Sequence, residues 1–495
     1  MPKKLPIFYS ALMLTGVNLL LRLVSTSFQV YISGHIGAAG VGLLQLVMSV
    51  GGLALTAGIA GVRTATMYLA AGELGRKKTG NICWVLSGCF TYSILCSVAV
   101  SGLLYFFAPT LAEHWIGDAQ TLPAIRLFAC FLPVTCLAGV MVGYFTAANR
   151  IGTLAVVEIA EQLLYMAVTM TLLTVWAGHD PVRACQCMIF GSGISSCFCL
   201  LCLTVLRLRQ KAPAAPRLPV RRQLLETAVP LALADDLKAG ISTAENLMVP
   251  KRLTLYPLTE NPLAAFGMVC GMVFPILMFP AAILFSLAEL LIPELARCAA
   301  AGSKQRIRYL AKRSLKVALL YGCLFCGLEF LLSRELCLWL YKSQEAGTYL
   351  RLYALLMPML YCDAITDAMT KGLGQQKICV RNNIITSAMD VIFLFLLLPK
   401  YGMGGYLFSF LLTHLVNFLL SLRLLLRLVG RIFSLSTVLL SLAATGCAIF
   451  AAGHIYQPTL RGIGFTVILG CLLTLLGVIG KEDLTWLRGL IRKSS

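Results

Sequence analysis

Apolar runs of about 20 residues recur along the whole chain, and they limit what the sequence can fold into. A helix needs about 20 mostly apolar residues to cross the hydrocarbon core of a bilayer. Of the 495 residues, 59% are hydrophobic and only 13% are charged, which is about half the charged share of a typical soluble protein. The sequence therefore predicts an all-α polytopic membrane protein.

We predict about fourteen transmembrane helices joined by short connections, with no inserted soluble domain. The predicted spans are 8–33, 40–70, 82–107, 121–147, 153–177, 183–207, 224–248, 263–287, 309–332, 348–370, 378–398, 402–422, 433–453 and 461–479.

The distribution of basic residues fixes the predicted orientation. With the N-terminus inside, the cytoplasmic segments carry roughly three times as many Lys and Arg residues as the outer segments, as the positive-inside rule requires. Both termini should then be cytoplasmic, in the cell membrane. The net charge of +20 follows from this topology and from the anionic inner leaflet, so we expect membrane lipids as partners and no nucleic acid.

A weak internal repeat indicates two lobes. "TMYLAAGELGRKK" (66–78) is similar to "LIPELARCAAAGSKQR" (291–306), and "GYFTAANRIG" (143–152) is similar to "AMTKGLGQQKI" (368–378). Both comparisons give an offset of about 225 residues, as expected for a parallel repeat of six helices. The predicted parts are an N-terminal lobe (1–210), a basic cytoplasmic linker (211–222), a C-terminal lobe (223–430), and two further helices with a tail (431–495).

Ionisable residues interrupt span seven, "PLALADDLKAGISTAENLMVPKR" (230–252). Asp235 lies 13 residues from Arg222, about 20 Å along a helix and therefore near mid-bilayer. A charge facing lipid at that depth costs about 2.5–3.5 kcal/mol. The helix periodicity places four polar residues on one face: Asp235, Lys238, Ser242 and Glu245. We interpret this face as lining a water-filled cavity.

Span one carries a similar polar stripe. Its members are Asn18, Arg22, Ser25 and Gln29. Under the repeat, spans one and seven are equivalent, and their stripes could face each other across a central cleft. Further polar residues within spans are Arg63, Asp236, Glu158, Glu161, Asp363, Asp367 and Asp390. The alternative is that such residues form internal salt bridges, and Glu158, Glu161 and Asp367 are near enough to cytoplasmic ends to reach the interface.

The 19 cysteines are scattered through apolar runs, as in "CFCLLC" (197–202). Metal sites need pairs of Cys or His at fixed spacings that the fold brings together, whereas scattered free cysteines in apolar runs pack as small hydrophobic residues. No nucleophile motif or phosphate-binding glycine loop stands out. We therefore expect buried structural cysteines, no bound metal, no cofactor and no enzymatic activity.

Four stretches in matching order resemble the stage V sporulation protein B-like polysaccharide transporters. They are "YISGHIGAAGVGLLQLVMSV" (31–50), "AENLMVPKRL" (244–253), "GMVFPILMFPAAILFSLAELLIPELARCAAAG" (271–302) and "YCDAITDAMTKGLGQQK" (361–377). These transporters belong to the multidrug/oligosaccharidyl-lipid/polysaccharide (MOP) exporter superfamily. The resemblance implies two helical bundles with a polar cleft, alternating access, and a role in cell-envelope polysaccharide biosynthesis or sporulation.

The resemblance also implies a lipid-linked sugar as substrate, although one position departs from the pattern. Lipid II flippases of this superfamily have several arginines in their first helices, and Arg22 matches the first of them. A later Arg-Asp pair is replaced here by Phe28 and Gln29. The departure argues against lipid II itself, whereas a lipid-linked anion remains consistent with the residues.

We therefore expect a flippase that moves a lipid-linked oligosaccharide or a related anionic precursor and works as a monomer. Arg22, Arg63 and Lys238 would bind the diphosphate, because arginine forms bidentate, charge-assisted bonds with phosphate. Coupling to H⁺, Na⁺ or the membrane potential would involve Asp235, Asp236, Asp363 or Asp390. Two alternatives are a cation-coupled multidrug exporter, although span one holds no acid, and a non-transporting membrane scaffold.

The topology can be tested with reporter fusions. A reporter fused after Ser495 should report a cytoplasmic location, and one inserted in the loop 253–261 should report an external one. The reverse pair of locations would contradict the predicted orientation.

Overall fold

The computed structural model describes residues 7–76, 79–178, 180–209, 221–430, 432 and 434–480. The described residues are almost entirely helical, and no strand occurs among them. Within these ranges, ten helices are long and apolar enough to cross a membrane, or eleven if one bent pair of helices counts as a span. The chain is an all-α polytopic membrane protein. Residues 211–220 of the predicted linker and the tail 481–495 lie outside the described residues.

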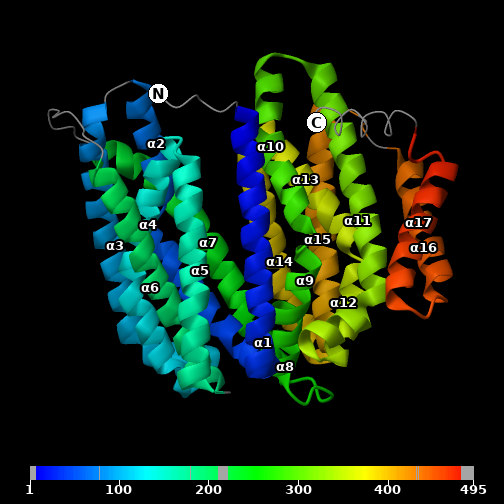
Figure 1. Cartoon of the computed structure of the whole chain (residues 1–495), viewed down its shortest axis with the longest axis horizontal. Helices are drawn as coiled ribbons and strands as arrows, with labels where there is room; N and C mark the ends of the chain where they lie inside the picture. The colour runs from blue at the N-terminus through cyan, green and yellow to red at the C-terminus, as the bar shows by residue number, and fades with distance from the viewer. Residues whose placement is uncertain are drawn as a thin grey trace. The chain divides into compact units, whose positions relative to one another are not determined.

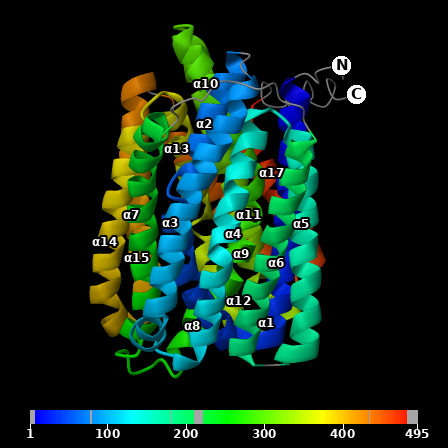
Figure 2. The ribbon, with the colours of Figure 1, turned by 90° about the vertical axis from the view of Figure 1, so that its left-hand side faces the viewer.

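Contacts divide the chain into two compact units, called unit 1 and unit 2 below. Unit 1 comprises Met1–Gly271 and Leu394–Gly402, and unit 2 comprises Met272–Phe393 and Met403–Ser495. The helices of unit 1 are α1 (Ile7–Ile59), α2 (Val62–Gly75), α3 (Ile82–Thr110), α4 (Leu122–Ala147), α5 (Ile151–Leu172), α6 (Pro181–Leu208), α7 (Arg221–Leu253) and α8 (Pro262–Gly267). In unit 1, α4 packs between α3 and α6, and α5 packs on α6 (Figures 1 and 2).

Unit 2 contains nine helices in its described residues, one of which, α14, ends in unit 1. They are α9 (Phe274–Met278), α10 (Ala281–Ala300), α11 (Lys304–Tyr341), α12 (Gln344–Ala354), α13 (Met357–Gly372), α14 (Gln376–Tyr401), α15 (Met403–Val429), α16 (Leu435–Gly453) and α17 (Pro458–Leu475). Short 3-10 or π-helical turns are η1 (Thr79–Asn81), η2 (Leu111–Ile116), η3 (Ala119–Thr121), η4 (Leu173–Ala177) and η5 (Met268–Val273).

All fourteen predicted spans fall on helices, but the count of fourteen is not confirmed by length and hydropathy. Two predicted spans belong to one apolar stretch, Leu23–Leu74, whose backbone leaves the helical conformation at Gly37 and again at Ala60 and Gly61. Charged residues lower the hydropathy of α7, and α12 and α13 have only 11 and 16 residues. The number of membrane crossings stays a prediction.

Hydroxyl groups inside the helices are satisfied by the helices themselves. Thr66 donates to the carbonyl of Val62 at 2.7 Å, and Thr366 donates to the carbonyl of Cys362 at 2.7 Å. In a solvent without hydrogen-bonding partners, a hydroxyl that returns to the carbonyl four residues earlier avoids the penalty of an unpaired polar group. This is why Ser and Thr residues are tolerated within the predicted spans.

Glycines allow the helices of unit 1 to approach each other closely. A Cβ atom on Gly267 of α8 would lie 2.0 Å from the carbonyl oxygen of Ala38 in α1, and a Cβ on Gly42 would lie 2.2 Å from the carbonyl oxygen of Leu263. Small residues at such crossings bring two backbones together, which is the main route to tight packing between membrane helices. The α1–α8 contact therefore depends on both glycines.

In unit 2, the pair of helices α16 and α17 packs on α11. The ring of Phe465 in α17 is fully buried and lies over Gly327 of α11, where a Cβ would be 1.9 Å from the ring. Arg461 ties the start of α17 to the same helix, because it donates to the Leu331 carbonyl at 3.1 Å and to Glu335 at 2.9 Å. The two C-terminal helices are thus part of one packed group with α11.

The helix α7 packs differently from the predicted repeat. The sequence assigns residues 223–430 to the second lobe, whereas α7 contacts α1, α2 and α3 and clusters with unit 1. Its buried residues include Leu224, Ala228, Ala232 and Leu247. Sequence similarity between repeats identifies equivalent helices, but it does not determine which neighbours a helix packs against.

The α1–α8 contact yields a stability prediction. Gly267→Ala should lower the free energy of unfolding by about 1–3 kcal/mol, because its methyl group overlaps the Ala38 carbonyl. Thermal unfolding in detergent would measure this. Gly34→Ala is the matched control, since a Cβ at Gly34 has nothing within 4 Å. Equal unfolding temperatures for the two variants would contradict the close contact.

Candidate functional site

The polar stripe of α7 borders the face by which this helix packs in unit 1. Asp235, Lys238 and Ser242 are exposed, and Glu245 is half-buried. Asp236 points toward the packed side, where it interacts electrostatically with Tyr92 of α3 and with Asp235. One carboxylate oxygen of Asp236 is buried without a hydrogen-bond partner among the described residues. The structure therefore separates Asp236 from the stripe that the spacing predicts.

Hydrogen bonds to α1 hold α7 in place next to this stripe. Thr243 donates to the carbonyl of Ser49 at 3.1 Å, and the side-chain amide of Asn246 donates to the Ser49 hydroxyl at 2.9 Å. The hydroxyl of Ser49 in turn donates to the carbonyl of Gln45 at 2.7 Å. Because Thr243 and Asn246 of α7 both donate to Ser49 of α1, this contact fixes the rotation of α7 about its own axis.

The predicted stripe of α1 is only partly described. The side chains of Asn18 and Arg22 lie outside the described residues. Ser25 is exposed, and Gln29 is half-buried. The amide of Gln29 donates to the carbonyl of Gly271 in η5 at 3.0 Å, so one of its donors serves helix packing.

A polar cavity of about 370 Å³ lies between α1, α5 and α6 in unit 1, and we call it the chamber. Its volume is in the usual range of small-molecule pockets, about 300–1,000 Å³. The residues that line the chamber are Leu21, Glu158, Glu161, Gln162, Tyr165, Ser192 and Ser195. Leu21 directly precedes Arg22 in α1, so the backbone of the predicted arginine is next to this cavity.

The glutamates of the chamber interact with Arg63 through space. Arg63 lies in the first turn of α2, is exposed, and exerts its positive charge on Glu158 and Glu161. No salt bridge within 4.0 Å joins the described side chains of these three residues. The backbone of Arg63 is fixed against α4, since a Cβ on Gly143 would lie 2.4 Å from its carbonyl oxygen. The chamber thus holds two carboxylates, and the charge of Arg63, which is not among the lining residues, acts on both of them.

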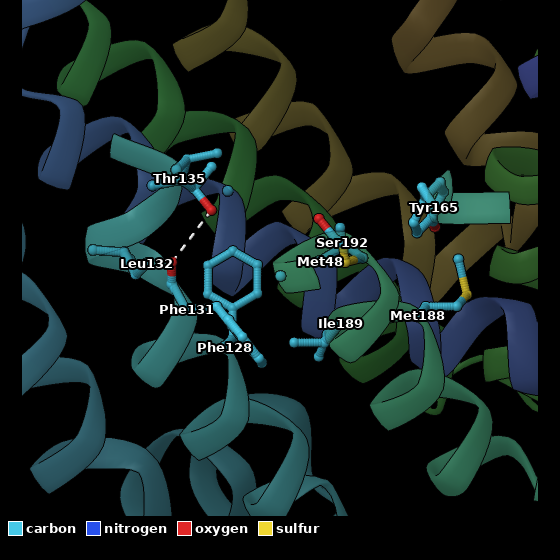
Figure 3. A pocket seen from close by; sticks show the side chains of 12 residues that line it. Met48, Phe128, Phe131, Leu132, Thr135, Tyr165, Met188, Ile189 and Ser192 are labelled. Atoms are coloured by element: carbon cyan, nitrogen blue, oxygen red, sulfur yellow. Dashed lines mark hydrogen bonds between the residues drawn. The ribbon is translucent and has the colours of Figure 1, made fainter. Parts of the chain in front are cut away.

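An apolar pocket of about 140 Å³ adjoins the chamber (Figure 3). Tyr165 and Ser192 line both cavities. The remaining residues that line this pocket are Met48, Gly52, Leu55, Phe128, Phe131, Leu132, Thr135, Met188, Ile189 and Gly193. The hydroxyl of Thr135 donates to the carbonyl of Phe131 at 3.3 Å, which leaves methyl and ring surfaces to line the pocket.

Unit 2 contains a separate buried polar cluster on α13, α14 and α15. Asp363 is 8% exposed and accepts hydrogen bonds from the amide of Asn417 at 3.2 and 3.1 Å. Asp390 is also 8% exposed and accepts hydrogen bonds from Ser409 at 2.5 Å and Thr413 at 3.3 Å. Both predicted ion-coupling residues of this unit are therefore hydrogen-bonded to α15, whereas Asp235 and Asp236 belong to unit 1.

Comparisons with known proteins agree with this architecture. Residues 253–396 match the family model described as MatE. Stage V sporulation protein B of Bacillus subtilis (strain 168) is 22% identical over 411 residues, which cover 79% of this chain and 78% of that protein. The structure of the lipid II flippase MurJ in an inward closed conformation aligns with a TM-score of 0.69 at 13% identity, covering 96% of this chain and 100% of that chain.

A multidrug resistance MATE family transporter of the MOP superfamily, in an inward-facing conformation, aligns with a TM-score of 0.64 at 14% identity and covers 84% of this chain and 98% of that chain. Our chain has the MOP fold. The resemblance to stage V sporulation protein B that the motifs indicate is also confirmed. Within this fold, the chamber and the α7 stripe lie in unit 1, and the Asp363 and Asp390 cluster lies in unit 2.

A run of polar residues at helical spacing in α5 indicates the chamber, although it is not one of the two predicted stripes. Glu158, Glu161, Gln162 and Tyr165 are at i, i+3, i+4 and i+7 in α5, which is the same one-face pattern as the stripes of spans one and seven. Because Glu158 and Glu161 are close to the predicted cytoplasmic end of their span, the sequence also allows them to lie at the membrane interface. The structure instead places all four on the wall of one cavity.

Cysteine labelling tests whether the α7 stripe faces water. In a variant without native cysteines, Asp235→Cys, Lys238→Cys and Glu245→Cys should react faster with a hydrophilic thiol reagent than Leu237→Cys. Leu237 is a matched control, because it is 51% exposed but lies off the stripe. Equal labelling at all four positions would show that the stripe does not line a water-filled cavity.

Proposed function

We propose that this protein is a transporter that moves a lipid-linked oligosaccharide, or a related anionic cell-envelope precursor, across the cytoplasmic membrane by alternating access. The observation that carries the proposal is the chamber, a polar cavity among membrane-length helices whose two glutamates lie within the electrostatic influence of Arg63, which forms no salt bridge with a described residue. A lipid-linked sugar needs a sheltered polar path for its head group, while its chain can stay in lipid. The relatives are named as a lipid II flippase, a sporulation protein and multidrug transporters, and none of these names describes an enzyme.

In the proposed mechanism, Arg22, Arg63 and Lys238 bind the diphosphate of the cargo. Guanidinium groups suit this role, since their planar donors match the oxygens of a phosphate. Asn18, Ser25 and Ser242 would bind sugar hydroxyls, and the described members of this set are exposed. We further propose that the protein acts as a monomer with both termini in the cytoplasm, and that it carries out no chemical reaction on its cargo.

Ion coupling is a separate part of the proposal. We propose that H⁺, Na⁺ or the membrane potential resets the carrier through Asp235, Asp236, Asp363 or Asp390. Support comes from the burial of Asp363 and Asp390 with neutral hydrogen-bond partners, since no cation lies within 4.0 Å of either carboxylate among the described residues. A buried carboxylate without a fixed cation is suited to bind a mobile one.

One observation favours a second function, export of organic cations. The chamber holds two carboxylates and shares a wall with an aromatic, apolar pocket, which would suit an amphiphilic amine. A scaffold without transport activity gains nothing from either cavity. Transport assays with a labelled polyprenyl-diphosphate sugar and with a fluorescent organic cation would distinguish the two transporters.

Substitution of Arg22 tests the proposed role of the arginines. Arg22→Ala should abolish flipping of a labelled polyprenyl-diphosphate sugar in vesicles while the protein still folds and inserts. Arg22→Lys should retain part of the activity, because it keeps the charge but loses the bidentate contact. Arg150→Ala is the matched control, since Arg150 is exposed in the turn before α5, away from both stripes.

A double-mutant cycle separates substrate binding from a structural ion pair. If Arg22 only neutralises Asp235 or Asp236, Arg22→Ala should destabilise the protein, and removal of the acid as well should restore its stability. Rescue of both thermal stability and flipping by Asp235→Ala or Asp236→Ala would reject the substrate role of Arg22.

A further inference from the structure

The chamber contains two carboxylates, which binding of a purely anionic cargo does not need. Glu158 and Glu161 lie one turn apart on the same face of α5, and both side chains line the cavity. Each is half-buried, and neither forms a salt bridge with any residue that the structure describes. Among the described residues, the positive charge recorded as acting on these carboxylates is that of Arg63.

Binding of a diphosphate would remove this counter-charge. In the proposed function Arg63 binds the cargo, and its guanidinium then neutralises phosphate oxygens instead of the two glutamates. Carboxylates that are half-buried and lose their counter-charge become costly, because a charge in a cavity of low dielectric is stable only when it is paired. An ammonium group that reaches the chamber together with the anion would restore a positive charge beside the two glutamates.

We propose that the cargo itself supplies this charge, through an ammonium group on its sugar head that binds between Glu158 and Glu161. This inference rests on the proposed function and names its substrate class: a lipid-linked sugar with a free amine, whose head group is zwitterionic. The opposite charges of Arg63 and the glutamates match such a head group, because the phosphate and the ammonium of one molecule can contact both poles at once.

The remaining chamber residues fit the same ligand. Gln162 offers both donors and an acceptor, Tyr165 offers a hydroxyl, and Ser192 and Ser195 lie opposite on α6. These groups match sugar hydroxyls, which also donate and accept. A divalent metal is a poorer match, since no group of three or more His, Cys, Asp or Glu side chains with suitable geometry occurs in the described ranges.

The test compares two probes that differ at the sugar nitrogen, which is a charged amine in one and a neutral amide in the other: a short-chain polyprenyl diphosphate-linked glucosamine and its N-acetyl counterpart. Binding to the purified full-length protein is measured at mildly acidic pH, where the amine is protonated. The wild-type protein should bind the free-amine probe about tenfold more tightly, as one charge-assisted contact provides. In Glu158→Gln/Glu161→Gln this ratio should fall to about one, which is a loss of that tenfold preference.

Controls keep the outcomes distinct. Glu113→Gln removes an exposed carboxylate outside the chamber and should leave the preference intact. If the double variant does not fold, Glu158→Gln and Glu161→Gln alone should each lower the ratio. Equal binding of both probes by the wild-type protein overturns the inference. A preference that survives both substitutions also overturns it, because the amine would then be recognised somewhere other than at Glu158 and Glu161. Failure of both probes to bind contradicts the proposed function instead.

Discussion

A polar group within the membrane-length helices is costly unless it finds a partner inside the protein, and much of the structure follows from this constraint. Hydroxyls such as Thr66 and Thr366 return to the carbonyl of their own helix. Glycines such as Gly42 and Gly267 let two helix backbones approach closely. Close packing matters in a membrane because moving an apolar side chain from lipid into the protein gains little hydrophobic free energy. Groups that cannot be satisfied locally, chiefly carboxylates and guanidinium groups, gather around shared cavities or clusters.

The two units meet this constraint in different ways. In unit 2, Asp363 and Asp390 are buried and accept hydrogen bonds from one neighbouring helix, so the cluster is closed. In unit 1, Glu158 and Glu161 line a cavity, and neither forms a direct ion pair with a described residue. A closed cluster suits a small ion or a stable fold, whereas an open one suits a ligand that brings its own charges.

The fold class and the helical segments are predictable from the sequence, because hydropathy and length depend only on local composition. Part of the α7 stripe also follows from helical spacing, since Asp235, Lys238 and Ser242 are all exposed, whereas the α1 stripe stays a prediction. The packing of the helices against each other cannot be predicted in the same way. Which helices are neighbours decides three features: the direction in which Asp236 points, the grouping of α7 with unit 1, and the chamber around Glu158. A single sequence does not contain that information. Two predicted spans also fall within one apolar stretch, Leu23–Leu74. The helix breaks at Gly37 and Gly61 that divide this stretch depend on backbone angles, which hydropathy does not record.

The wall formed by Tyr165 and Ser192 has a consequence for how this protein responds to apolar molecules. Both residues line the chamber on one side and the apolar pocket on the other. Anything that enters the pocket and shifts the Tyr165 ring alters the chamber as well. By thermodynamic linkage, a head group bound in the chamber must change the affinity of the pocket by the same factor. Solvents, detergents or lipid chains of the right width would then act as effectors of this protein without competing for its charged groups.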